Sequence, residues 1–315
     1  MLTEIRKTFD ALRKLRLGDQ IKSLESVGVM SADCISLLQA NCDLEDIGWK
    51  GKGTKSYGVF HPTGSADGVF SRAVRKELWI GDRVEFEDLW AEFVTAMNAA
   101  KDAKDKPTTL PLADSRAVDR MFYTSVVGFG AAVDLFGAGD RSGPGTFFEM
   151  VVGPTISLLT GRAETGAVVV DVPGAPGETD RVPVDLSFLG THDEIALVVP
   201  TKISTRERIS QAYVHQAILN TAGHPIEYRS VLCIGNENNM VREDRSAAKS
   251  FKNAFVTDTL VPSTIVQYQR YIAELDGLYY LDPPEDYLKG KKSGFPNVGE
   301  FATLLTTDLP ALLTV

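Results

Sequence analysis

The chain has 315 residues, of which 43% are hydrophobic and 24% are charged, and its formal net charge is −9 at pH 7. This composition is ordinary for a soluble globular protein, and the length allows one large domain or two smaller ones. The acidic balance argues against unspecific binding of nucleic acid over the whole surface, although it still allows positive charge to gather in one cleft.

The sequence also lacks the usual signs of export or membrane insertion. No apolar run reaches the roughly 18 residues that a membrane span needs. The N-terminal segment is charged and amphipathic, without the apolar stretch of a signal peptide. The three cysteines form no CxxC pattern, which argues against a disulfide framework or a cysteine zinc site. We therefore expect no membrane contact and a location in the reducing cytoplasm.

Helical periodicity marks residues 1–48, and residues 85–104 predict a further helix. Between them, residues 48–68 are rich in Gly, Lys and Ser, which predicts a long loop. A segment of charged residues and prolines at 105–111 indicates a domain boundary.

The predicted loop carries three lysines among aromatic side chains: Lys50, Lys52 and Lys55. Such a mixture could follow the phosphates of a nucleic acid and stack on a base. An ordinary loop anchored by its aromatic residues explains the pattern equally well.

After the boundary, the pattern predicts helices, three strands, a helix and a strand. A helix followed by a Gly-rich turn is expected at 115–139 and a second helix at 145–161. The strands are expected at 166–172, 181–190 and 194–202, the next helix at about 205–221 and the last strand at 229–238. The turn at residues 191–194 joins the second and third strands as a hairpin. This order predicts an α/β core with a central mixed sheet flanked by helices.

Three charged side chains stand out against these apolar elements. Asp185 lies inside the second strand, Lys202 ends the third, and Glu149 lies on the helix before the sheet. The hairpin brings Asp185 close to Lys202. Two carboxylates and a lysine suit Mg²⁺ and a phosphodiester better than they suit zinc. A purely structural ion pair between Asp185 and Lys202 explains the spacing equally well.

The triplet Arg206-Glu207-Arg208 follows Lys202 at the start of the next helix. Arginine can contact guanine O6 and N7 together, and glutamate can accept from cytosine N4, so the triplet has the chemistry to read C:G pairs. Ser204 and Glu207 also match a capping box, which offers a structural explanation. The arginines oppose the helix dipole, however, so dipole electrostatics does not account for them.

The order Glu149, Asp185, Lys202 resembles the PD-(D/E)XK nuclease core. More specifically, the stretch from Lys202 to Arg208 is similar to the signature of the restriction endonucleases related to NgoMIV, EcoRII and PspGI, which read CCGG, CCNGG or related sites. The resemblance covers about residues 145–240. It implies a catalytic role for Lys202 and base contacts from the triplet.

Three departures from that signature concern the metal ligands. Pro183 lies two residues before Asp185 rather than one, and Pro200 takes the place of the acid two residues before the lysine. Gln216 stands where related enzymes recover an acid on the following helix, and it could bind a metal weakly through its carbonyl oxygen. Glu149 would then matter more than usual.

The resemblance implies a PD-(D/E)XK catalytic domain at residues 106–315 and a helical N-terminal region at residues 1–105 that contributes to DNA contacts and dimerisation. We expect a Mg²⁺-dependent type II restriction endonuclease that binds double-stranded DNA as a homodimer. Asp185, Glu149 and Gln216 are the expected metal ligands. A repair or recombination nuclease without base specificity is one alternative, and a non-enzymatic nucleic-acid-binding protein is another.

Overall fold

The protein is described from a computed structural model that covers residues 7–12, 18–64, 69–137, 143–190, 194–204, 208–222, 226–242, 254–259, 261–289 and 294–314. Its helices are α2 (Gln20–Asn41), α3 (Arg83–Lys101), α4 (Ser115–Phe136), α5 (Gly143–Thr160), α6 (Ile209–Thr221), α7 (Pro262–Tyr271), α8 (Glu285–Lys289), α9 (Phe301–Thr303), the π-helical turn η1 (Leu304–Asp308) and α10 (Leu309–Leu312). Its strands are β1 (Cys42–Trp49), β2 (Tyr57–Pro62), β3 (Ala73–Arg75), β4 (Glu164–Asp171), β5 (Thr179–Phe188), β6 (Ala196–Val198), β7 (Thr201–Lys202), β8 (Tyr228–Asn236), β9 (Asn238–Arg242), β10 (Ala254–Asp258), β11 (Gly277–Asp282) and β12 (Val298–Glu300).

A mixed seven-stranded sheet forms the centre of the described structure. Its strand order is β12-β11-β8-β6-β5-β4, and β7 also pairs with β8. The strands β4, β5 and β6 are antiparallel neighbours, whereas β6, β7 and β11 run parallel to β8. The mixed α/β core expected from the sequence is therefore confirmed.

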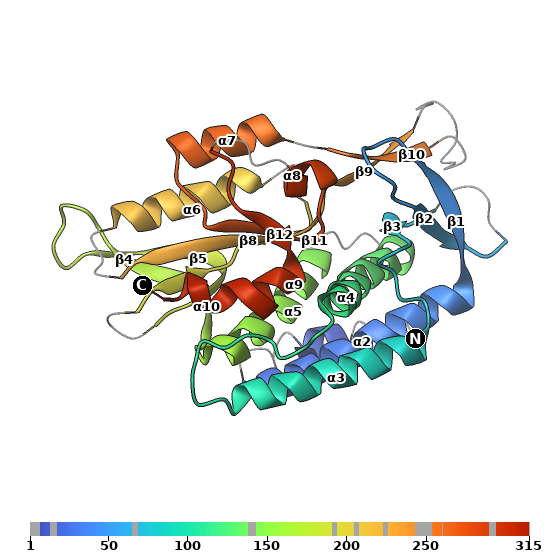
Figure 1. Cartoon of the computed structure of the whole chain (residues 1–315), viewed down its shortest axis with the longest axis horizontal. Helices are drawn as coiled ribbons and strands as arrows, with labels where there is room; N and C mark the ends of the chain where they lie inside the picture. The colour runs from blue at the N-terminus through green and yellow to red at the C-terminus, as the bar shows by residue number, and fades with distance from the viewer. Residues whose placement is uncertain are drawn as a thin grey trace.

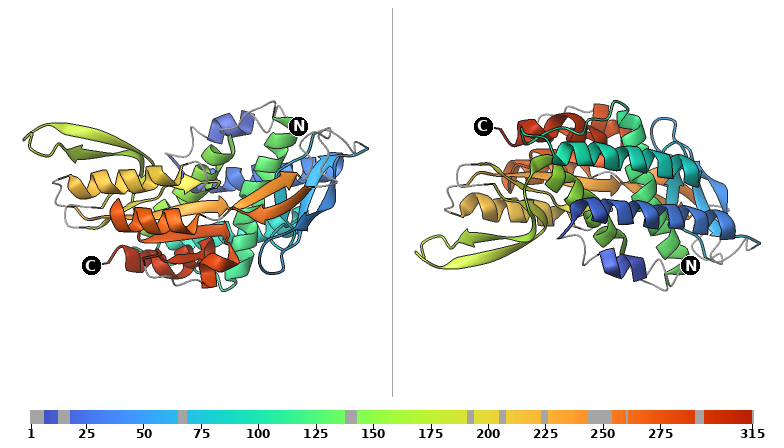
Figure 2. Two further views of the ribbon diagram at one scale, coloured as in Figure 1. Left: turned by 90° about the horizontal axis from the view of Figure 1, so that it is seen from above. Right: turned by 90° about the horizontal axis from the view of Figure 1, so that it is seen from below.

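Helices cover both faces of this sheet, because successive strand residues point to opposite sides. Val231 and Cys233 of β8 join the large core that includes α2, α3, α4 and α5. Their neighbours Leu232 and Ile234 pack instead with α6 and α7. Figures 1 and 2 show the resulting layers, with the β4–β5 hairpin extending beyond the end of the sheet.

Aspartate caps define where the long helices begin. Asp82 accepts hydrogen bonds from the first turn of α3 at 2.7 and 3.1 Å, and Asp114 accepts one from Ala117 of α4 at 3.0 Å. Asp19 caps α2 in the same way. Each cap satisfies an amide that the helix itself leaves without a partner.

The N-terminal third contains strands as well as helices, which corrects the expected long loop at residues 48–68. β1 and β2 form a hairpin, and β1 also pairs in parallel with β10 from the distant C-terminal part. The resulting five-stranded sheet has the order β3-β2-β1-β10-β9. The boundary near residue 105 stays a prediction, and the large core runs through both sides of it: the rings of Phe93 and Phe122 lie 5.3 Å apart.

A buried carboxylate links the two sheets. Asp282 ends β11 and is 1% exposed. Its Oδ1 accepts from Lys55 Nζ at 3.0 Å and from Arg75 Nη1 at 2.5 Å. Its Oδ2 accepts from the Tyr57 hydroxyl at 2.9 Å and from Asn238 Nδ2 at 3.1 Å. A charge buried this deeply is tolerated because every one of these contacts compensates for lost hydration.

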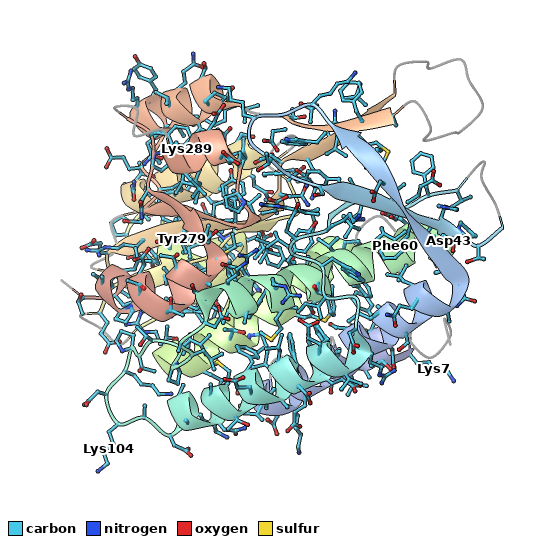
Figure 3. All side chains as sticks on the ribbon, turned by 45° about the vertical axis from the view of Figure 1, so that its right-hand side comes forward. Lys7, Asp43, Phe60, Lys104, Tyr279 and Lys289 are labelled. Atoms are coloured by element: carbon cyan, nitrogen blue, oxygen red, sulfur yellow. The ribbon has the colours of Figure 1, made fainter. Side chains whose placement is uncertain are left out.

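Two hydrogen bonds hold the C-terminal helical segment, α9 to α10, in place: Tyr279 connects it to the sheet and Asp119 connects it to α4. Tyr279 of β11 is buried, and its hydroxyl donates to Asp308 Oδ2 at 2.7 Å (Figure 3). Asp119 of α4 accepts the Ala302 backbone N–H at 2.8 Å, which satisfies the start of α9. Within the described residues, no helix is both long and apolar enough to cross a membrane.

Asp119 should make the stability of the fold depend on pH. Burial is the main cause that raises its pKa to about 8, against the Ala302 hydrogen bond, which lowers it. Because the folded state then holds this proton more tightly than the unfolded state, Asp119 should reduce stability progressively as the pH rises from about 4 to about 8. Asp119→Asn keeps the hydrogen-bond acceptor and removes the charge, so its stability relative to wild type should increase over that interval.

Urea unfolding of wild type and Asp119→Asn at both ends of this pH interval measures the effect. The same substitution at the exposed Asp43 serves as the control. A stability difference between Asp119→Asn and wild type that does not change with pH would contradict the prediction.

Candidate active site

Asp185 and Lys202 lie in direct contact on the central sheet. Lys202 Nζ is 2.5 Å from Asp185 Oδ2, and the side chains are 11% and 24% exposed, respectively. The same Asp185 oxygen accepts the Thr201 backbone N–H at 2.9 Å. The expected proximity of this acid and this lysine is therefore confirmed.

A break in the third predicted strand produces this geometry. Residues 194–202 form two short strands, because β6 ends at Val198 and β7 begins at Thr201, after Pro200. The Pro200 carbonyl accepts from Cys233 of β8, whereas the Thr201 N–H points to Asp185. The N–H and C=O of one strand residue point to the same side, so the Thr201 carbonyl also faces the side of Asp185.

The pair lies on the face of the sheet that α6 covers. Lys202 is opposite Ile234 in the β7–β8 register, and Ile234 packs against Ile209 and Tyr213 of α6. Side chains directly opposite one another on neighbouring strands point to the same face. One further side chain of α6, His215, is close enough for its pKa to be affected by both Asp185 and Lys202.

Asp185 offers one oxygen to a cation. Its Oδ2 is used by Thr201 and Lys202, while its Oδ1 has no hydrogen-bond partner in the described part of the chain. Mg²⁺ is commonly held by one or two carboxylates together with waters and substrate phosphates, so a single free carboxylate oxygen fits its chemistry. Among the described residues no group of three His, Cys, Asp or Glu side chains is arranged to hold a metal by itself.

The other two expected metal ligands lie in different surroundings. Glu149 is half-buried on α5, which contacts both β5 and β7. Gln216 of α6 is 3% exposed, and its amide nitrogen donates to the Tyr228 carbonyl at 2.9 Å. Its amide oxygen accepts from the Ser230 hydroxyl. The Gln216 amide is therefore already used to hold α6 on β8, and its role as a metal ligand stays a prediction, as does that of Glu149.

No protein-family model matches the chain, and no curated protein sequence matches it. Among solved structures, the type IIP restriction endonuclease Kpn2I matches 96% of this chain and 95% of its own, with 25% sequence identity and a TM-score of 0.73. The chain has a restriction-endonuclease fold. The complex of restriction endonuclease PspGI with substrate DNA overlaps over 70% of this chain and 89% of its own, with 13% identity and a TM-score of 0.38.

Of the triplet, only Arg208 belongs to the part of the chain that the structure describes. Arg206 and Glu207 are outside the described residues. Arg208 is exposed and is the N-terminal residue flanking α6, which begins at Ile209 rather than at 205 as expected. Arg208, and not Ser204, is the N-cap residue of α6 and makes no side-chain cap hydrogen bond, so the expected role of Ser204 as N-cap is wrong; Glu207 lies outside the described residues. Arg208 thus stands at the open end of the helix that covers the Asp185–Lys202 pair.

Each of the three lysines of the expected basic loop contacts another side chain of the protein, and only Lys55 is buried. Lys50 Nζ lies 3.8 Å from the centroid of the Phe255 ring, and the exposed Lys52 pairs with Asp286 at 3.0 Å. The Lys55 side chain is 1% exposed because it is bound to Asp282. This burial does not suit a phosphate contact by Lys55. DNA contacts by Lys50 and Lys52 stay predictions.

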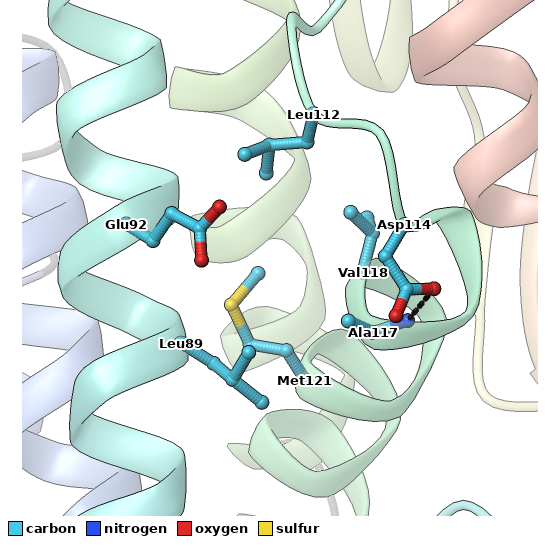
Figure 4. A pocket seen from close by; sticks show the side chains of 7 residues that line it. All are labelled: Leu89, Glu92, Leu112, Asp114, Ala117, Val118 and Met121. Atoms are coloured by element: carbon cyan, nitrogen blue, oxygen red, sulfur yellow. Dashed lines mark hydrogen bonds between the residues drawn. The ribbon is translucent and has the colours of Figure 1, made fainter.

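A small pocket of about 130 Å³ lies elsewhere, between α3 and α4 (Figure 4). Its lining residues are Leu89, Glu92, Leu112, Asp114, Ala117, Val118 and Met121. None of them belongs to β5, β7 or α6. The pocket is therefore not part of the Asp185–Lys202 site.

Sequence reasoning did not assign His215 to the site, although it lies next to Gln216. Its imidazole is half-buried, and burial is the main cause that lowers its pKa, with Asp185 raising and Lys202 lowering it. The placement of a helix residue such as His215 near a strand residue such as Asp185 gives no spacing signal in the sequence. The sequence shows only a histidine in the helix that follows Lys202.

Proposed function

We propose that this chain is a Mg²⁺-dependent type II restriction endonuclease, which cuts double-stranded DNA at a palindromic site containing C:G pairs. The observation that carries the proposal is the contact between Asp185 and Lys202 in a fold similar to Kpn2I over almost its whole length. An acid and a lysine on neighbouring strands are typical of phosphodiester hydrolysis, and the base-reading triplet follows them directly.

Asp185 Oδ1 and the Thr201 carbonyl are the groups of the described site that would hold Mg²⁺, with Glu149 and Gln216 as further candidates. Mg²⁺, when bound, lowers the pKa of a coordinated water and offsets the charge of the scissile phosphate. Asp185 has a second task, because its Oδ2 holds the Lys202 ammonium in place.

Lys202 supplies a fixed positive charge beside the phosphate. As water attacks phosphorus, negative charge grows on the equatorial oxygens, and an ammonium already in position stabilises it without reorganisation. The attacking water forms a new P–O bond in line with the P–O3′ bond, which breaks. The products are a 5′-phosphate and a 3′-hydroxyl, which takes up a proton from solvent.

Two further parts of the proposal concern the DNA as a duplex. Arg206, Glu207 and Arg208 read C:G pairs from the major groove, and Arg208 does so from the N-terminal end of α6. A palindromic duplex has the same sequence on both strands and is therefore two-fold symmetric. A homodimer with the same symmetry places one active site at each strand.

Arg208→Ala should weaken binding to the cognate site by roughly 1–3 kcal/mol, which is the discrimination that one bidentate arginine–guanine contact provides. Binding to unrelated duplexes should change much less. Fluorescence anisotropy with Ca²⁺ in place of Mg²⁺ measures both affinities. Lys22→Ala, which removes an exposed charge from α2, is the control. Equal losses on cognate and unrelated DNA would contradict a base contact by Arg208.

Digestion of a sequenced plasmid tests the function itself. With Mg²⁺, the wild-type protein should give discrete fragments whose ends share one sequence, and EDTA should abolish the cutting. Fragments with random ends would instead identify a repair-type nuclease without base specificity. A protein that binds DNA and never cuts it would be a non-enzymatic binding protein.

A further inference from the structure

His215 lies on the edge of α6 that is turned toward β5. Four residues further along the same edge, Leu219 packs with Val184 of β5 and Val198 of β6. The opposite edge of α6 is turned toward α7, where the rings of Tyr213 and Tyr268 lie 5.5 Å apart. The helical repeat therefore places His215 on the same side as Asp185.

The electrostatics of the imidazole agrees with this placement. The charged groups that shift the pKa of His215 are Asp185 and Lys202. Both come from the strands beneath α6, and neither belongs to the same helix. The ring makes no hydrogen bond to any described residue. As far as the described residues are concerned, the half-buried imidazole therefore has a ring nitrogen that could hydrogen-bond a ligand.

The site also needs a group that orients the attacking water, and an imidazole can do so. Pro200, in the place of an acid, has no polar side-chain atom, and the Gln216 amide is bound to Ser230 and Tyr228. Asp185 is then the carboxylate that the Asp185–Lys202 pair offers on the α6 face of the described sheet. Its Oδ2 accepts from Lys202 and Thr201, and its Oδ1 would hold the cation, so another group is needed to orient the attacking water.

We propose that His215 is a further catalytic residue, whose neutral ring nitrogen accepts a hydrogen bond from the attacking water. This role rests on the proposed function and adds to it. The hydrogen bond turns a lone pair of the water toward the scissile phosphorus, on the side of the phosphate opposite the leaving oxygen. Such orientation lowers the activation barrier because the entropic cost of aligning the water with the phosphorus is met before the reaction.

Three substitutions at position 215 test the role. His215→Phe keeps a ring of similar shape and loses the hydrogen bond. His215→Asn and His215→Gln carry an amide near the positions of Nδ1 and Nε2, respectively, so the better of the two identifies the nitrogen involved. Val214→Ala, a change at the exposed neighbour on the outer face of α6, is the matched control.

The readouts are the single-turnover cleavage rate with Mg²⁺, the affinity for the cleaved duplex with Ca²⁺, and thermal unfolding. We expect His215→Phe to slow cleavage roughly 100-fold with unchanged affinity and unfolding temperature, a loss typical of a misaligned reacting group. Either His215→Asn or His215→Gln should recover a large part of that rate.

Wild-type cleavage by His215→Phe would overturn the inference and leave the proposed function intact. A loss of unfolding temperature shared by all three variants, with no rescue by an amide, would likewise overturn it in favour of a packing role. Absence of cleavage by the wild-type protein would overturn the proposed function itself, and the role of His215 with it.

Discussion

Replacing Asp185 by Asn or Lys202 by Met should reduce the cleavage rate by at least about 10²–10³-fold, the usual loss when one preorganised charge is removed from a transition state. Asp185→Asn removes the carboxylate that holds both Lys202 and the proposed cation. Lys202→Met keeps the length of the side chain and removes its charge. Both side chains are partly exposed, so the fold should survive.

A double variant separates a shared role from two independent roles. If Asp185 and Lys202 act on the same phosphate, Asp185→Asn together with Lys202→Met should be little slower than the slower single variant, because residues that act as a unit are not additive. Single-turnover rates and urea unfolding measure both effects. Glu285→Gln, which breaks the exposed pair with Lys289, is the control. Fully additive losses would contradict a shared role. Normal cleavage by both single variants would show that Asp185 and Lys202 form only a structural ion pair.

The second large effect concerns stability. Asp282→Asn should destabilise the protein by about 3–5 kcal/mol, the cost of breaking a buried charge cluster by removing one partner. Lys55, whose side chain is 1% exposed, would lose the carboxylate that it contacts. Because Asp282 connects both sheets, the loss should appear as one cooperative shift of the unfolding curve.

The electrostatics of Asp282 sets the pH range of this contribution. Burial alone would raise its pKa, but Lys55 and Arg75 outweigh burial and lower it. A lowered pKa in the folded state means that the stabilisation is complete above the ordinary pKa of an aspartate and is lost only in acid. Urea unfolding of wild type and variant at neutral and acidic pH measures the difference.

The exposed pair between Asp46 and Lys76 gives the matched comparison for Asp282. Asp46→Asn should cost no more than about 1 kcal/mol, as is usual for a surface ion pair. An equally small cost for Asp282→Asn would show that the buried cluster contributes no more than a surface contact.

Hydrophobic periodicity in the sequence predicted the elements around the site because their contacts are local. The helix, three strands, helix and strand from residue 143 to 236 occur in the expected order. Asp185 and Lys202 are 17 residues apart, so one hairpin connection brings them together. The break at Pro200, after which Lys202 pairs with β8, and the start of α6 at Ile209 had no counterpart in the pattern.

The remaining features depend on contacts between distant residues. The burial of Lys55 could not be predicted, because its partner Asp282 lies 227 positions away. β1 and β2 fall in segments predicted as helix and loop, since β1 is completed by pairing with β10 near the other end of the chain. His215 and Gln216 are neighbours in sequence, yet only the orientation of α6 separates the imidazole beside Asp185 from the amide bound to β8.

The central claim is that Asp185 and Lys202 meet at one phosphate of the DNA. A crystal structure of the wild-type protein with its cleaved site as duplex, and with Ca²⁺ to slow hydrolysis, tests it most directly. In that complex Lys202 Nζ should lie within about 3 Å of a scissile phosphate oxygen, a hydrogen-bonding distance, and Asp185 should bind the cation. A complex in which the DNA passes elsewhere and the pair remains away from every phosphate would contradict it.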